Sequence, residues 1–119
     1  DSAMVARIIC GLNRSSINLC GKLSLLESVA LMSQAKMNYT NDSAPMHMAS
    51  SVNAQVTAFF CSTVPEFGFG PLSTYSVIAQ TNEILKCRPC GIHGHRQCPE
   101  NDFRCGLSID TSKFVNFNV

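Results

Sequence analysis

Along this chain, apolar residues recur first at helical spacing and then in short runs that suit strands. In residues 2–12 the apolar positions repeat every three or four residues and Gly11 supplies a stop, so we predict a helix there. Ser24 and Glu27 have the spacing of a capping box, in which the serine caps the first turn and the glutamate reaches back. A second helix is therefore predicted from Ser24 to about residue 34.

Short apolar runs predict the strands. They cover residues 17–20, 37–40 and 56–60. A helix is predicted between the last two, from Pro45 to about residue 52. This alternation of strands and helices is typical of an α/β fold with a parallel sheet and crossover helices. Ligands of such sheets bind at the carboxyl ends of the strands, where we expect Leu23 and Asp42 to lie.

Residues 40–47 combine a strand end, a polar turn and a helix start. The backbone N–H groups of Ser43, Ala44 and Met46 are expected to be unpaired and to face outward at this helix start. The helix dipole adds positive potential there. A phosphate or pyrophosphate is the ligand that such a turn favours.

Asp42 and His47 add an acid and an imidazole to the same turn. The sequence also permits a simpler interpretation. Asp42 or Ser43 could act only as the N-cap of the helix, and His47 could be an ordinary surface or core histidine.

Composition excludes several classes of function. Charged residues make up 14% of the 119 residues, against roughly 25% in an average domain. This low share suggests that part of the surface is covered by another part of a larger protein. The net charge is +1 and no basic run is present, so we expect no nucleic-acid partner. No apolar stretch approaches the roughly 20 residues of a membrane span, which leaves peripheral membrane contact at most.

The chain has seven cysteines, several of them in a Cys-rich loop at residues 87–105. The spacing permits a zinc site made of Cys87, Cys90, Cys98 and Cys105. We favour instead a structural loop without metal, packed by buried or locally bridged cysteines. The remaining cysteines fall on apolar positions of predicted helices and strands, which suits the reducing cytosol better than secretion.

Three motifs in a fixed order resemble those of a known family. They are NDSAPMHMAS at residues 41–50, VTAFFCSTVPEFGFGPLS at 56–73 and CRPCGIHGHRQCPENDFRC at 87–105. Together they look like the C-terminal half of a bacterial glycosyltransferase of family 9, the family of the lipopolysaccharide heptosyltransferases. Two departures stand out: Ala44 is found where glycine is frequent, and residues 61–65 replace a Gly-Pro-Thr-Asp-Pro-like loop.

The resemblance implies a GT-B type fold, with two Rossmann-like domains that face each other across a cleft. Because 119 residues make at most one domain, we expect residues 1–119 to be a partial, incomplete C-terminal domain that binds the nucleotide sugar. The N-terminal acceptor domain and the first strands would then be absent. On its own, such a chain is expected to be inactive.

The resemblance also implies the reaction and its site. A heptose or related sugar would pass from a nucleotide-diphosphate donor, ADP-heptose, to a lipopolysaccharide or lipid-linked acceptor held by the other domain. No cofactor is expected. The donor contacts implied are Leu23, Asp42, Ser43, Ala44, Pro45 and His47.

No catalytic set is apparent in the sequence, so the general base is expected from the other domain. The implied location is the cytoplasm, including the inner face of the inner membrane. A non-enzymatic phosphate-binding module and a zinc-organised interaction module are the alternatives.

Overall fold

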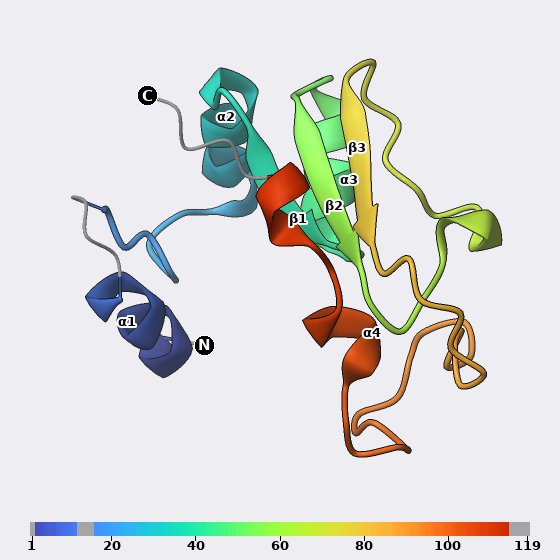
Figure 1. Cartoon of the computed structure of the whole chain (residues 1–119). Helices are drawn as coiled ribbons and strands as arrows, with labels where there is room; N and C mark the ends of the chain where they lie inside the picture. Colours follow the sequence, from blue (N-terminus) through green and yellow to red (C-terminus); the bar gives the residue numbers. More distant parts are fainter. Residues whose placement is uncertain (1, 12–15, 115–119) are drawn as a thin grey trace.

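A computed structural model describes residues 2–11 and 16–114 (Figure 1). Helical segments and strands alternate from residue 25 to residue 80, and a long Cys-rich loop follows. The helices are α1 (Ser2–Cys10), α2 (Leu25–Gln34), α3 (Ala44–Ser51) and α4 (Arg104–Leu107), with 3-10 turns at η1 (Pro65–Phe67) and η2 (Thr111–Lys113). The strands are β1 (Asn38–Asn41), β2 (Val56–Phe60) and β3 (Ser76–Gln80).

The described residues form one three-stranded sheet in the order β1-β2-β3, and both pairs of neighbouring strands are parallel. Asn38 lies opposite Val56, and Phe60 lies opposite Gln80. Four of the five residues of β2 are buried, as expected for the middle strand of a parallel sheet. The α/β prediction is confirmed, and β2 has the bounds predicted from its apolar run.

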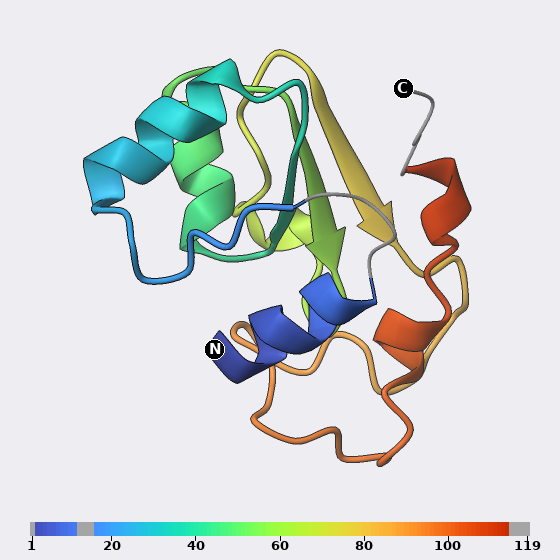
Figure 2. The same cartoon turned by 90° about the vertical axis from the view of Figure 1, so that its left-hand side faces the viewer.

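Helices α2 and α3 cover one face of the sheet, whereas η2 lies on the other face (Figure 2). The core between α3 and the sheet consists of two groups of fully or nearly fully buried side chains. One group is Met46, Ala58 and Phe60; the other is Ala49, Ala54 and Val56, against which Met32 of α2 packs. Burial of these side chains fixes α3 on β2, so the start of α3 is held at the carboxyl end of β1.

The capping box predicted for α2 is confirmed. The backbone N–H of Ser24 donates to Glu27 Oε2 at 2.7 Å, and the N–H of Glu27 donates to Ser24 Oγ at 3.3 Å. The other end of α2 is tied to the sheet by the buried Asn38, whose Nδ2 donates to the carbonyls of Met32 at 3.1 Å and Gln55 at 2.9 Å.

The strand predicted at residues 17–20 is wrong, because this segment is irregular and ends in a turn. The side chain of Asn18 accepts a hydrogen bond from the N–H of Cys20 at 3.0 Å, and the N–H of Lys22 donates to Leu19 O. Such local bonds compete with strand pairing. Leu23 therefore does not follow a strand. Strand β3 was not predicted from the sequence.

The other element bounds differ from the predictions by one or two residues. Helix α1 ends at Cys10, and the predicted end at residue 12 lies outside the described residues. Strand β1 and helix α3 are each shifted by one residue. Shifts of this size are usual at element ends, where the chain leaves regular geometry gradually.

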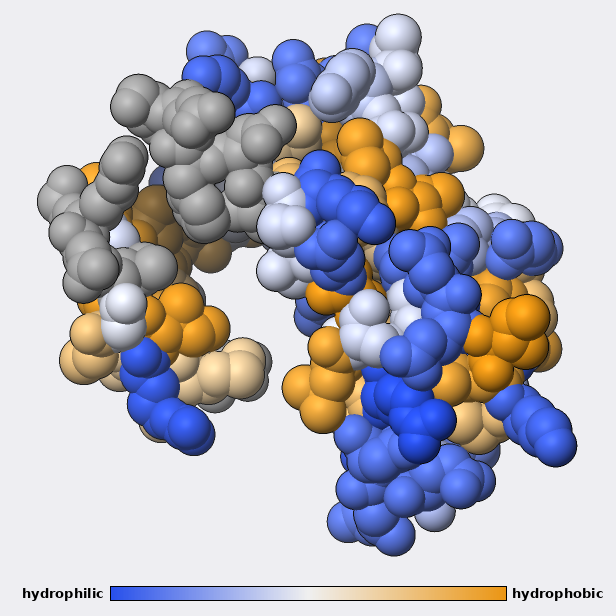
Figure 3. All heavy atoms as spheres, viewed as in Figure 1, coloured by the Kyte–Doolittle hydropathy of each residue, from blue (hydrophilic) through white to orange (hydrophobic). Residues whose placement is uncertain are grey.

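Helix α1, the Cys-rich loop and α4 all lie beyond the carboxyl ends of the strands (Figures 1 and 2). None of the residues of α1 is buried. In the space-filling view an open gap separates α1 from the Cys-rich loop, whose outer surface is largely hydrophilic (Figure 3). Within the described residues, no helix combines the length and apolar character needed to cross a membrane.

Candidate functional site

A cavity of about 600 Å³ opens at the carboxyl ends of β1 and β2. Its volume lies within the usual range of small-molecule sites. Its walls come from the β1–α3 turn, the loop after β2 and the Cys-rich loop. The lining residues are Asn41, Asp42, Ser43, Ala44, His47, Phe59, Cys61, Ser62, Thr63, Phe69, Ile92, His93 and Phe103.

Asp42 is the half-buried acid of this cavity, and its side chain is held in place. The hydroxyl of the buried Thr63 donates to Asp42 Oδ2 at 2.5 Å. The backbone N–H of Asp42 donates to Phe59 O at 3.2 Å, which continues the β1–β2 pairing by one residue. The loop after β2 therefore sets the orientation of the carboxylate.

The start of α3 differs from an ordinary capped helix. Ser43 occupies the N-cap position in extended conformation, but its side chain makes no capping hydrogen bond. The carboxylate of Asp42 contacts Thr63, as described above, and Pro45 lies in the first turn. The simpler interpretation, in which these side chains act as helix caps, does not match the hydrogen bonds found.

One prediction about this turn is wrong. The N–H of Met46 is not unpaired, because it donates to Ser43 O at 3.0 Å in a tight first turn. Among the described residues, no hydrogen-bond acceptor is found for the N–H groups of Ser43 and Ala44. Ser43 and Ala44 are exposed residues that line the cavity, where the dipole of α3 favours an anion.

Comparison with known proteins gives the family. The family model described as glycosyltransferase family 9 (heptosyltransferase) matches residues 1–102. The chain belongs to glycosyltransferase family 9. This family 9 chain is also similar to lipooligosaccharide heptosyltransferase 2 of Haemophilus influenzae, with 36% identity over 74 residues. That match covers 60% of this chain and 21% of the relative, so the chain spans about a fifth of the relative's length. No solved structure matches the chain.

The structure places four of the six donor contacts expected for a family 9 chain around one cavity: Asp42, Ser43, Ala44 and His47. His47 is exposed on the first turns of α3. Pro45 and Leu23 are not among the lining residues. Leu23 is half-buried in the turn that precedes α2.

Several residues that line the cavity of this family 9 chain were not predicted from the sequence. Thr63 is one, and its position three residues beyond the end of an apolar parallel strand is the signal that could have identified it. Ile92, His93 and Phe103 come from the Cys-rich loop. Their sequence separation from β2 gives no such signal, because they reach the cavity only through folding of the loop.

All seven cysteines carry free thiols, and Cys105 is the buried one. In the described residues, no three His, Cys, Asp or Glu side chains come close enough together to hold a metal ion. The zinc ligands considered above, Cys87, Cys90, Cys98 and Cys105, are thus not gathered into a metal site. Burial raises the pKa values of the Cys61, Cys90 and Cys105 thiols.

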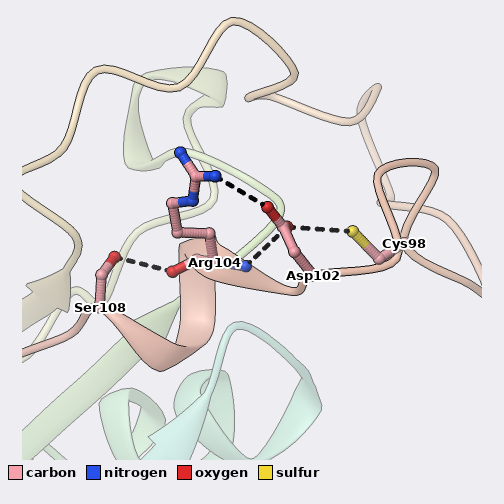
Figure 4. A network of polar contacts seen from close by, with 4 residues as sticks. All are labelled: Cys98, Asp102, Arg104 and Ser108. Carbon is pink, nitrogen blue, oxygen red and sulfur yellow. Dashed lines mark hydrogen bonds and ion pairs between the residues drawn. The ribbon is translucent and has the colours of Figure 1, made fainter.

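Cys98 differs from these thiols in its surroundings. The backbone N–H groups of Phe103 and Asp102 hold the pKa of Cys98 below its usual value. Its Sγ contacts Asp102 Oδ1 at 3.9 Å in a polar network that ends the Cys-rich loop (Figure 4). Asp102 also pairs with Arg104 Nη2 at 3.2 Å, and Ser108 Oγ donates to Arg104 O at 2.7 Å. This network joins the loop to α4.

Proposed function

We propose that the protein is a glycosyltransferase that moves a heptose from ADP-heptose to a sugar hydroxyl of a lipopolysaccharide or lipid-linked acceptor. Residues 1–119 would then lie in the C-terminal, donor-binding domain of a two-domain enzyme at the inner face of the inner membrane. The observation that carries the proposal is the cavity at the ends of β1 and β2, which four expected donor contacts line in a family 9 chain.

The cavity offers complementary groups for the two halves of such a donor. A diphosphate suits the start of α3, where Ser43, Ala44 and His47 line the cavity: the N–H groups of the first two residues, the helix dipole and the imidazole can all bind an anion. Asp42, oriented by Thr63, can accept hydrogen bonds from hydroxyl groups of the sugar. A nucleotide-diphosphate sugar needs both kinds of contact.

In the reaction, the oxygen of the acceptor hydroxyl forms a bond to the anomeric carbon of the heptose. The bond between that carbon and the diphosphate oxygen breaks, and ADP leaves. A general base on the other domain takes the hydroxyl proton. The role of this chain is to stabilise the negative charge that develops on the leaving diphosphate, through fixed N–H groups that need no rearrangement.

The test compares ligands and variants in the full-length protein. ADP-heptose and ADP should each raise the melting temperature, whereas free heptose should not, because the fixed N–H groups recognise phosphate. Asp42→Ala and His47→Ala should reduce turnover strongly while lowering the melting temperature little. His95→Ala is the matched control, since His95 is an exposed histidine outside the cavity. Protection by heptose alone, or equal turnover in all three variants, would contradict the proposal.

A further inference from the structure

The side chain of Arg88 anchors the Cys-rich loop on the loop after β2. We propose that Arg88 is a positioning residue of the donor site, which holds Thr63 so that its hydroxyl orients Asp42. This inference rests on the proposed function of the cavity. It assigns the Cys-rich loop a part in donor binding.

The guanidinium of the half-buried Arg88 binds four oxygen atoms that lie around the end of the sheet. Its Nε donates to Cys61 O at 2.8 Å, and its Nη2 donates to Thr63 O at 2.9 Å. The same Nη2 contacts Gln80 Oε1 at 2.8 Å and, more weakly, Phe60 O at 3.5 Å. A planar fork of donors can bridge acceptors from two neighbouring strands in this way, whereas a lysine ammonium lacks the geometry.

A hydrogen bond and a close approach of the backbone also hold the Cys-rich loop against Ser62, in the loop after β2. The N–H of Cys90 donates to Ser62 O at 2.8 Å. Gly94 has a φ of +73°, a conformation that favours glycine, and a Cβ at this position would lie 2.5 Å from Ser62 Oγ, so the two loops approach each other closely there. The carbonyls of Cys61, Ser62 and Thr63 thus all accept hydrogen bonds from the Cys-rich loop.

Arg88 is linked to Asp42, the acid of the cavity, through Thr63. Thr63 accepts a bond from Arg88 at its carbonyl and donates one to Asp42 at its hydroxyl. The position of the Thr63 backbone therefore fixes the position of the hydroxyl that orients Asp42. Arg88 itself is not among the lining residues, so any effect of it on the donor must pass through the residues that it holds.

The test is a double-mutant cycle in the full-length protein, with donor KM, kcat and melting temperature measured for each variant. Arg88→Met should raise the KM for ADP-heptose by about tenfold, because charge-assisted hydrogen bonds that position Thr63 are lost. Thr63→Val keeps the carbonyl bound by Arg88 but removes the hydroxyl that contacts Asp42. In the Thr63→Val background, Arg88→Met should change the donor KM less than about twofold. Arg96→Met, at an exposed arginine of the same loop, should leave the KM unchanged.

The outcomes separate this inference from the proposed function. A wild-type protein that neither binds nor uses ADP-heptose refutes the proposed function before any variant is made. An active wild type whose Arg88→Met variant has an unchanged donor KM, or keeps its whole effect in the Thr63→Val background, overturns the role of Arg88. If Arg88→Met does not fold, Arg88→Lys replaces it. Its donor KM should then rise by a smaller factor, and an unchanged KM overturns the inference.

Discussion

The hydrogen bond between Thr63 and Asp42 gives the sharpest prediction about the donor cavity. In Thr63→Val the side chain keeps its shape and loses the hydroxyl that donates to Asp42 Oδ2 at 2.5 Å. Hydrogen bonds to charged groups contribute roughly 1.5–3 kcal/mol to stability. Because Asp42 is only half-buried, water can replace part of this bond, and we expect the lower end of the range.

A loss of about 1.4 kcal/mol corresponds to a tenfold change in an equilibrium constant. If the orientation of Asp42 is needed for the donor, Thr63→Val should weaken ADP-heptose binding by up to about tenfold. Isothermal titration of the full-length protein with ADP-heptose measures this Kd directly. The valine creates no cavity of its own, so loss of packing does not account for such a change.

Thr81→Val is the matched control for this prediction. Thr81 is also buried, and its hydroxyl contacts Ser108 Oγ at 2.6 Å and accepts from the N–H of Glu83 at 3.0 Å. It lies outside the cavity. Both variants should lower the melting temperature, but only Thr63→Val should weaken donor binding. Equal donor Kd values in the two variants would refute the reasoning.

Two further predictions concern the start of α2 and the Cys-rich loop. Ser24→Ala should lower the free energy of unfolding by about 1 kcal/mol, the usual cost of losing a serine N-cap, as measured by denaturant titration. The bonds from Ser24 lower the pKa of Glu27, so their stabilising effect should be present above the unfolded-state pKa and disappear as pH falls through the folded-state pKa. Cys98 should react with iodoacetamide near neutral pH faster than Cys105, whose thiol is buried and has a raised pKa; peptide mass spectrometry measures both rates. Equal alkylation rates for the two thiols would contradict this.

The sequence indicates those parts of the fold that depend on local pattern. The apolar run at β2 gives its bounds because a middle parallel strand is buried on both faces. The capping box of Ser24 and Glu27 is found because both partners lie within one turn. Residues 17–20 mislead because an apolar run resembles a strand, whereas the side chain of Asn18 accepts a hydrogen bond from the backbone N–H of Cys20 in an irregular segment.

In the candidate site, too, local sequence pattern predicts some residues, whereas long-range contacts bring in others. Asp42 and His47 are recognised because a strand, a turn and a helix start are contiguous in the sequence. The contribution of His93 depends on how the Cys-rich loop docks on the sheet through Arg88. No periodicity or spacing encodes that contact, because it joins segments 25 or more residues apart.

The anchoring of the Cys-rich loop on the loop after β2 bears on how donor preference could be exchanged between relatives. A chimera that receives only residues 41–47 gains Asp42 and His47, but these residues then contact the recipient's own loop after β2 and its own Cys-rich loop. Residues 61–63 and 87–94 are joined by hydrogen bonds to three backbone carbonyls. We therefore expect that the two segments must be transferred together. Chimeras that move both segments together should retain a formed donor cavity, whereas chimeras that split them should bind donor poorly.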